Sequence, residues 1–331
     1  MDRESVNQSP VEPNQSPVVG PPPVVVISGA PRPRMVLLAI LCALLVMLIA
    51  RPAKVRAAWQ GVSVFLGLES KPEPASAGVL SEHEIEALDK MPPQAQAELL
   101  LERSINHYRG SNEQIAARVD GWRGQIKVEG RLYALFMGGL NSDDLRVRAA
   151  AIEIDLAGRD VEKTSASVDR LEPIARSGEQ SWRANALWDL GLLGSRGIEQ
   201  ERVTQIMLDS IHDPDETIRY WGVEGLAHLG TDATIAPLLD EFHNDPSPRV
   251  RERAACSLAQ SGMLNAKQRR SVVPKLIDFS DDPALDAETR TWVFQALRDI
   301  TGQELPHDSA AWRNWFHSND GVWHGAVRDS Q

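Results

Sequence analysis

The chain has little of what catalytic and metal-binding proteins usually display. It holds only two cysteines among 331 residues, Cys42 and Cys256, which excludes a disulfide framework and a CxxC metal site. The eight histidines are scattered without HExxH or His-x-His, and no GxGxxG, Walker A or GxSxG motif occurs. A Ser–His–Asp site stays open, because geometry rather than sequence defines it. We therefore predict no catalytic residue, no metal ligand and no cofactor, and expect that the protein is not an enzyme.

A strongly basic surface is also missing. Residues 1–71 contain seven Lys or Arg and four Asp or Glu, a net charge of +3, so the remainder must carry −14 to give the total of −11. Proteins bind phosphate backbones with clustered Lys and Arg, so we expect no nucleic-acid partner. An acidic domain suits a basic protein or peptide partner, or simply stays in solution.

No apolar run reaches the usual length of a membrane span, but one comes close. Residues 35–50 (MVLLAILCALLVMLIA) are sixteen apolar residues without a charge, and as a helix they would measure about 24 Å. The flanking Arg34 and Arg51 can reach the head groups and make up the difference. We expect a single-pass transmembrane anchor. The alternative is a signal peptide cleaved after Ala57, and similar positive charge on both flanks leaves the orientation open.

The segments beside this run have a different composition from the rest of the chain. Residues 1–34 are rich in proline and contain NQSPV twice, so we expect a disordered tail that is partly polyproline II. Residues 51–78 are interpreted as a juxtamembrane segment and linker, and residues 319–331 as a second tail. Between the linker and the repeats, residues 79–123 predict about three helices that form an N-terminal cap. Two capping boxes are predicted there, Ser81-x-x-Glu84 and Ser111-x-x-Gln114.

A motif recurs within residues 124–303. An arginine is followed by a small residue three positions later, a leucine seven later and a glycine eleven later, and a fourth copy is looser. The arginines are spaced by 36, 32 and 39 residues, and they are Arg183, Arg219, Arg251 and Arg290. The small residue, leucine and glycine share one helical face, so each copy predicts an amphipathic helix that a neighbour can approach closely. A self-similar period of this length is typical of an α-solenoid.

Each motif helix has a predicted partner in front of it. A turn rich in Asp and Pro precedes the motif arginine, and a further apolar helix precedes that turn. These partner helices are predicted at 199–211, 232–243 and 267–279. A degenerate copy, with helices near 125–140 and 143–157, carries Val147 where the arginine should be.

At this point the residues resemble the short bacterial HEAT repeats, including those related to phycobilin-lyase-type repeats. The segment DPSPRVRERAACSLAQSG (245–262) carries the resemblance best, followed by DPDETIRYWGVEGLAHLG (213–230). The resemblance implies an all-α solenoid of helix pairs, with residues 304–318 inside a C-terminal cap. It also implies a binding surface, because such repeats serve many unrelated partners. A lyase-like or enzyme-accessory protein is the alternative, and it would require a His, Cys or Tyr in a concave pocket. A nucleic-acid-binding HEAT protein is a third option, which the net charge of −14 disfavours.

The candidate site residues lie on the motif helices. The repeated Arg183, Arg219, Arg251 and Arg290 suggest a structural ladder that pairs with carboxylates of neighbouring turns, for which Asp213 or Asp215, Asp245, and Asp281 or Asp282 are available. If these helices line a concave groove, aromatic and acidic side chains there would bind a segment carrying Lys or Arg. The candidates for this role are Trp188, Tyr220, Trp221, Glu224, Glu252 and Trp292. We thus expect a membrane-tethered, non-enzymatic scaffold for protein–protein interaction.

Overall fold

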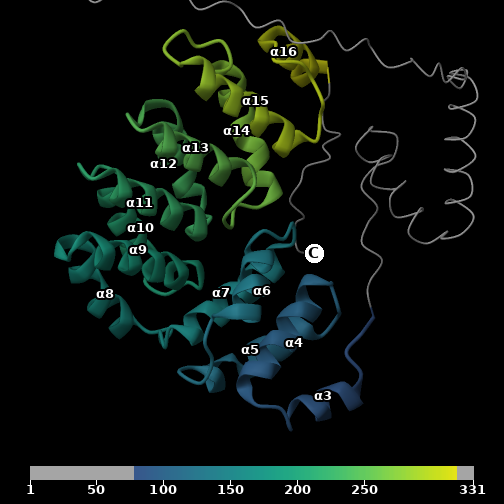
Figure 1. Ribbon diagram of the computed structural model, residues 1–331. Helices are drawn as coiled ribbons and strands as arrows, with labels where there is room; N and C mark the ends of the chain where they lie inside the picture. The colour runs from purple at the N-terminus through teal and green to yellow at the C-terminus, as the bar shows by residue number, and fades with distance from the viewer. Residues whose placement is uncertain (1–77, 319–331) are drawn as a thin grey trace, which may run out of the picture. The chain divides into compact units, whose positions relative to one another are not determined.

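The computed structural model describes residues 78–318, which form fourteen α-helices with no β-strand among them (Figure 1). The helices are α3 (Glu82–Leu88), α4 (Pro93–Ile105), α5 (Ser111–Trp122), α6 (Gly130–Leu140), α7 (Leu145–Gly158), α8 (Ser165–Ser177), α9 (Gln180–Ser195), α10 (Gln200–Ser210), α11 (Glu216–Leu229), α12 (Asp232–Asn244), α13 (Pro248–Ala259), α14 (Ala266–Phe279), α15 (Ala287–Thr301) and α16 (Ser309–Ser318). The expected tail 1–34, anchor 35–50 and C-terminal tail 319–331 lie outside the described residues, as does most of the expected linker. Within residues 78–318, none of the helices has both the length and the apolar composition needed to cross a membrane.

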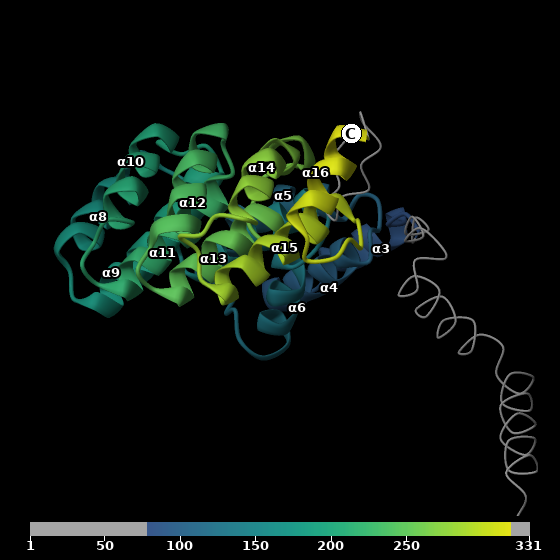
Figure 2. The ribbon, with the colours of Figure 1, turned by 90° about the horizontal axis from the view of Figure 1, so that it is seen from above.

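Two rows of helices build the main body (Figures 1 and 2). Helices α7, α9, α11, α13 and α15 pack one against the next and form what we call the inner row. The second row covers them: α8 packs on α9, α10 on α11, α12 on α13 and α14 on α15. The all-α expectation is confirmed, and the stacking of helix pairs is that of an α-solenoid.

Short polar turns and glycines set where the inner helices begin and end. Asp215 caps α11 by accepting from the Thr217 amide, and Asp286 caps α15 by accepting from the Thr289 amide. Gly230 ends α11 at a φ of 60°, a left-handed conformation that favours glycine. Its position also leaves no room for a side chain, since a Cβ there would lie 2.6 Å from the backbone of Met263.

Glycine also allows two inner helices to touch. A Cβ on Gly191 of α9 would lie 2.9 Å from the Cα of Gly225 on α11. A Cβ on Gly225 would in turn meet the Met207 sulfur of α10 at 2.2 Å. The backbones of α9 and α11 therefore approach each other directly, with α10 packed behind them.

The arginine ladder joins successive repeats. Each of its four arginines donates to a backbone carbonyl that lies before its own helix. Three of them also pair with a carboxylate in the turn before the next inner helix: Arg183 with Asp213, Arg219 with Asp245 and Arg251 with Asp286. Asp286 takes the place for which Asp281 and Asp282 were the expected candidates. Arg290 of the last copy donates to the Asp282 carbonyl at 3.1 Å.

The degenerate repeat contains a ladder arginine after all, one residue later than its expected position. Arg148, not the residue at 147, donates from Nε to the Ser142 carbonyl at 2.5 Å, six residues back as for Arg219 and Arg251. Its Nη1 donates at 2.5 Å to the carbonyl of Gly262, 114 residues further along the chain. Burial lowers the pKa of Arg148 to about 10. The start of α7 is thereby tied to the turn that follows α13.

The N-terminal helices α4 and α5 pack beside α6 and α7, and Leu88 of α3 belongs to the same buried cluster. Ser81 forms the predicted capping box with Glu84. The box predicted at Ser111 is wrong: Gly110, at a φ of 89°, is the N-cap of α5, and the Ser111 hydroxyl donates to the Tyr108 carbonyl instead. The left-handed glycine shifts the helix start by one residue, which puts Ser111 inside the helix.

The buried apolar side chains form two clusters, one around α3 to α7 and one running from α7 to α16. Leu140 and Trp188 pack against both clusters. At the far end, α16 contacts α14 and inserts Trp312, whose indole donates to the Pro306 carbonyl at 3.0 Å. Trp188 therefore lies at the junction of the N-terminal helices and the repeats.

Candidate functional site

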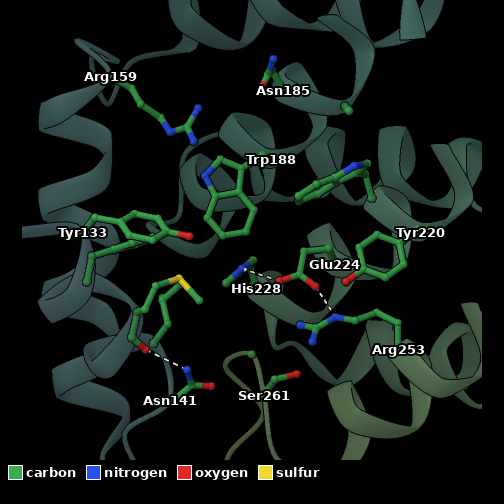
Figure 3. A pocket seen from close by; sticks show the side chains of 16 residues that line it. Tyr133, Asn141, Arg159, Asn185, Trp188, Tyr220, Glu224, His228, Arg253 and Ser261 are labelled. Carbon is green, nitrogen blue, oxygen red and sulfur yellow. Dashed lines mark hydrogen bonds and ion pairs between the residues drawn. The ribbon is translucent and has the colours of Figure 1, made fainter. Parts of the chain in front are cut away.

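A cavity of about 370 Å³ opens between α6 and the inner helices α9, α11 and α13 (Figure 3). Helix α6 contributes one wall through Tyr133, Phe136 and Met137, and the turn after α13 contributes Ser261 and Gly262. The tie between Arg148 and Gly262 holds these two sides together, because α6 packs on α7. The cavity thus depends on contact between segments that are far apart in the sequence.

Aromatic rings line the cavity as a connected series. The Trp188 ring of α9 stands edge-on to Phe136 and to Trp221, with centroid distances of 6.4 and 5.8 Å. Tyr220 continues the series at 5.6 Å from Trp221. The Trp188 indole donates to Asp155 of α7 at 2.8 Å, which fixes the ring at the junction of the two clusters.

A charged group lies among these rings. Glu224 of α11 forms an ion pair with Arg253 of α13, and its Oε1 lies 3.3 Å from Nε2 of His228, one turn later on α11 (Figure 3). Burial raises the pKa of Glu224, but the hydrogen bond from His228 and the charge of Arg253 outweigh it, so the pKa lies below its usual value. Burial lowers the pKa of Arg253, but the charge of Glu224 raises it by more, so the pKa lies above its usual value. Both groups of the pair therefore stay charged at neutral pH.

A second arginine lies on the other side of Trp188. Arg159, at the end of α7, pairs with Asp155 at 2.9 Å and approaches Asp189 at 3.6 Å. Burial raises the pKa of Asp189 to about 6. Neither aspartate lines the cavity, so its charged lining consists of two arginines and one glutamate. Glu224 is paired with Arg253, so the lining leaves no unpaired carboxylate for the Lys- or Arg-bearing occupant that the acidic composition suggested.

The structure brings four of the six candidate partner-binding residues to this cavity: Trp188, Tyr220, Trp221 and Glu224. Glu252 and Trp292 lie elsewhere, at a smaller depression of about 100 Å³ between α13 and α15. The difference follows from the helical register, because Glu252 and Arg253 are adjacent on α13 and point to different faces.

Several cavity residues were not candidates from the sequence. His228 had a usable signal, since it lies four positions after Glu224 and therefore on the same face of α11. Tyr133, Arg159 and Ser261 had none, because their place depends on how α6 and α7 fold back onto α13. A histidine in a concave pocket is the feature that the lyase-like alternative required, and His228 supplies it. Within residues 78–318, no group of three His, Cys, Asp or Glu side chains is placed to hold a metal ion.

Comparison with known proteins agrees with the repeat architecture. Residues 168–259, which run from α8 to the end of α13, match the family model for HEAT repeats. No curated protein matches the chain. The matched segment and the all-helical fold together support a HEAT-repeat helical solenoid.

Proposed function

We propose that this protein is a membrane-tethered, non-enzymatic scaffold that captures a segment of a partner protein in the cavity between α6 and the inner row. HEAT repeats generally serve as protein-interaction scaffolds, and residues 168–259 match the family model for HEAT repeats. The tether is proposed from the apolar run 35–50 and its flanking arginines.

The observation that carries the proposal is an aromatic cavity with an apolar rim. Tyr133 and Met137 of α6 are 52% and 39% exposed at the cavity, beside the rings of Trp188 and Trp221. Aromatic pockets that accept an anchoring side chain are typical of protein-binding sites. An exposed rim gives the rest of the partner segment an apolar surface to cover.

Site-specific crosslinking in the full-length protein tests this proposal. A photoreactive benzoylphenylalanine at position 133 should crosslink to a partner polypeptide, and the added Trp188→Ala substitution should abolish the product. The control is the same group at Trp182, which is 63% exposed on α9 but does not line the cavity. Identical products from both positions, or products that persist with Trp188→Ala, would show that the cavity is not the capture site.

One observation favours a second function, that of a lyase-like or enzyme-accessory protein. His228 and Glu224 form a polar pair within the cavity, and the Ser261 hydroxyl lines the same space. Ser261 Oγ has no hydrogen-bond partner among the described residues, whereas a serine nucleophile needs an adjacent base. A fluorophosphonate probe should therefore leave Ser261 unlabelled. Labelling of Ser261 that is lost with His228→Gln would favour the enzyme.

A further inference from the structure

Three polar groups in the cavity have hydrogen-bonding capacity that the protein does not use. His228 has a side chain only 5% exposed, and its Nδ1 has no hydrogen-bond partner among the described residues. The buried hydroxyl of Ser261 also lacks one. Nε of Arg253 pairs with Glu224, and its Nη1 makes only a weak hydrogen bond, at 3.8 Å, to the Cys256 sulfur. Buried polar groups are normally satisfied, so unsatisfied ones that line a cavity indicate an occupant.

Charge indicates which kind of occupant fits. Glu224 is already neutralised by its ion pair with Arg253 and its contact with His228, so it has no charge left for a cation. Arg159, the second arginine of the lining, is likewise paired, with Asp155 and Asp189, so it offers donors but no free charge. A serine hydroxyl and two guanidinium groups can all donate, and a carboxylate accepts such donors in strong, charge-assisted hydrogen bonds.

The size and the lining of the cavity indicate what kind of molecule carries that carboxylate. The volume of about 370 Å³ is at the small end of the range for ligand pockets, roughly 300–1,000 Å³. A chain end fits such a space better than a segment that must enter and leave. At a C-terminus the carboxylate is attached to the same Cα as a side chain, which the rings of Trp188 and Trp221 would cover.

We propose that the cavity binds the C-terminal carboxylate of a partner polypeptide whose last residue is aromatic or a large aliphatic. Arg253 and Ser261 hold the carboxylate, and the aromatic wall holds the last side chain. The inference rests on the proposed scaffold function and specifies what the scaffold recognises.

Fluorescence polarisation on the full-length protein in detergent micelles tests the inference. The probe is a fluorescein-labelled hexapeptide that ends in Leu-Phe with a free carboxylate, and the control is the same peptide as a C-terminal amide. We expect the acid to bind on the order of 10-fold tighter, since hydrogen bonds to a charged group contribute that much. Equal affinities would overturn the carboxylate proposal, while the crosslinking from position 133 would still report on the scaffold.

Variants of the cavity distinguish recognition from a general loss of structure. Ser261→Ala removes a hydroxyl that the fold does not use and should weaken binding of the acid about 3-fold or more without affecting the amide. Arg253→Gln combined with Glu224→Gln removes both charges of the ion pair together, so neither charge is left unpaired, and should abolish the preference for the acid. Glu252→Gln, on the same helix outside the cavity, should change nothing. A preference that survives the double substitution would overturn the proposal.

A small molecule is the remaining source to exclude. N-acetylphenylalanine carries the same carboxylate and ring without the rest of the peptide. It should compete with the hexapeptide only at much higher concentration, because it does not reach the rim formed by Tyr133 and Met137. Equal affinity for both would show that a free carboxylate, and not a polypeptide terminus, is the natural occupant.

Discussion

A ladder arginine such as Arg219 satisfies two different requirements with one side chain. Its guanidinium donates to a carbonyl left open before its own helix, and it also neutralises an aspartate in the next turn. Arg219 shows this most fully, since it contacts both oxygens of Asp245, at 2.7 and 3.2 Å. The Asp245 side chain is only 1% exposed. A buried carboxylate depends on its partner far more than an exposed one does.

Arg219→Ala should therefore lower the free energy of unfolding by about 3 kcal/mol, because it leaves the Asp245 carboxylate buried and unpaired. Chemical denaturation followed by circular dichroism measures this. The control is Arg176→Ala, whose pairs with Glu172 and Asp209 are at the surface and should contribute less than about 1 kcal/mol. Equal losses from both substitutions would contradict a structural role for the ladder.

A neighbouring group gives the same region an unusual pH dependence. Burial and the adjacent Asp245 carboxyl raise the pKa of Glu241 to about 8. The folded protein thus retains a proton that the unfolded chain releases near pH 4.5, so stability falls as the pH rises from about 4.5 to 8. Glu241→Gln is neutral throughout and should flatten this slope, with a gain of about 1–2 kcal/mol near pH 8. Denaturation at a series of pH values measures it, and Glu252→Gln, exposed on α13, should keep the slope of the parent.

At the scale of the helix, small residues decide how closely neighbours pack. Gly191→Ala should destabilise the protein by about 1–3 kcal/mol, because its Cβ would press on the backbone of Gly225. Gly121 in α5 is the matched case, since a Cβ there meets nothing within 4 Å. Gly121→Ala should stabilise by about 0.5–1 kcal/mol through helix propensity alone. Melting temperatures of the two variants should move in opposite directions; a shift in the same direction would refute the close-packing argument.

The helical elements were largely predictable because their signals are local. The arginine–small–leucine–glycine spacing places each inner helix, and Asp–Pro turns mark its start, so α11 and α13 begin where the motif indicates. Prediction was less successful where two local signals compete. Ser111 lies in a sequence typical of an N-cap, but Gly110 before it adopts the left-handed conformation and takes the N-cap position, so the helix already begins at Ser111.

The candidate site was predictable only in part, for the same reason. Trp188, Tyr220, Trp221 and Glu224 follow from repeat alignment, because the inner helices repeat the same orientation. The opposite wall does not follow, since α6 carries no motif, and α7, on which α6 packs, reaches the turn after α13 through the buried contact of Arg148. The charge of the cavity could not be predicted from the sequence either. An acidic composition says nothing about which carboxylates are already paired with arginine inside the fold.

At the scale of the whole molecule, the expected anchor makes a direct prediction. If residues 35–50 span the bilayer, the intact protein should remain with membranes through high-salt and alkaline carbonate washes, because an apolar helix is not held by charge. Immunoblots of the washed membranes measure this. A mature protein that begins at Ala58 would instead identify the run as a cleaved signal peptide.

The contact between Arg148 and Gly262 changes the mechanics of the array. A row of repeats in which each touches only its neighbours behaves as a spring, and it can stretch or fray from either end. The contact between Arg148 and Gly262 closes the part from α7 to α13 into a ring. Separating any two neighbouring helices of this ring would strain the contacts between all the others, so these helices should unfold together. The cavity should keep its dimensions until these helices separate, so the occupant that we propose would be selected by its shape.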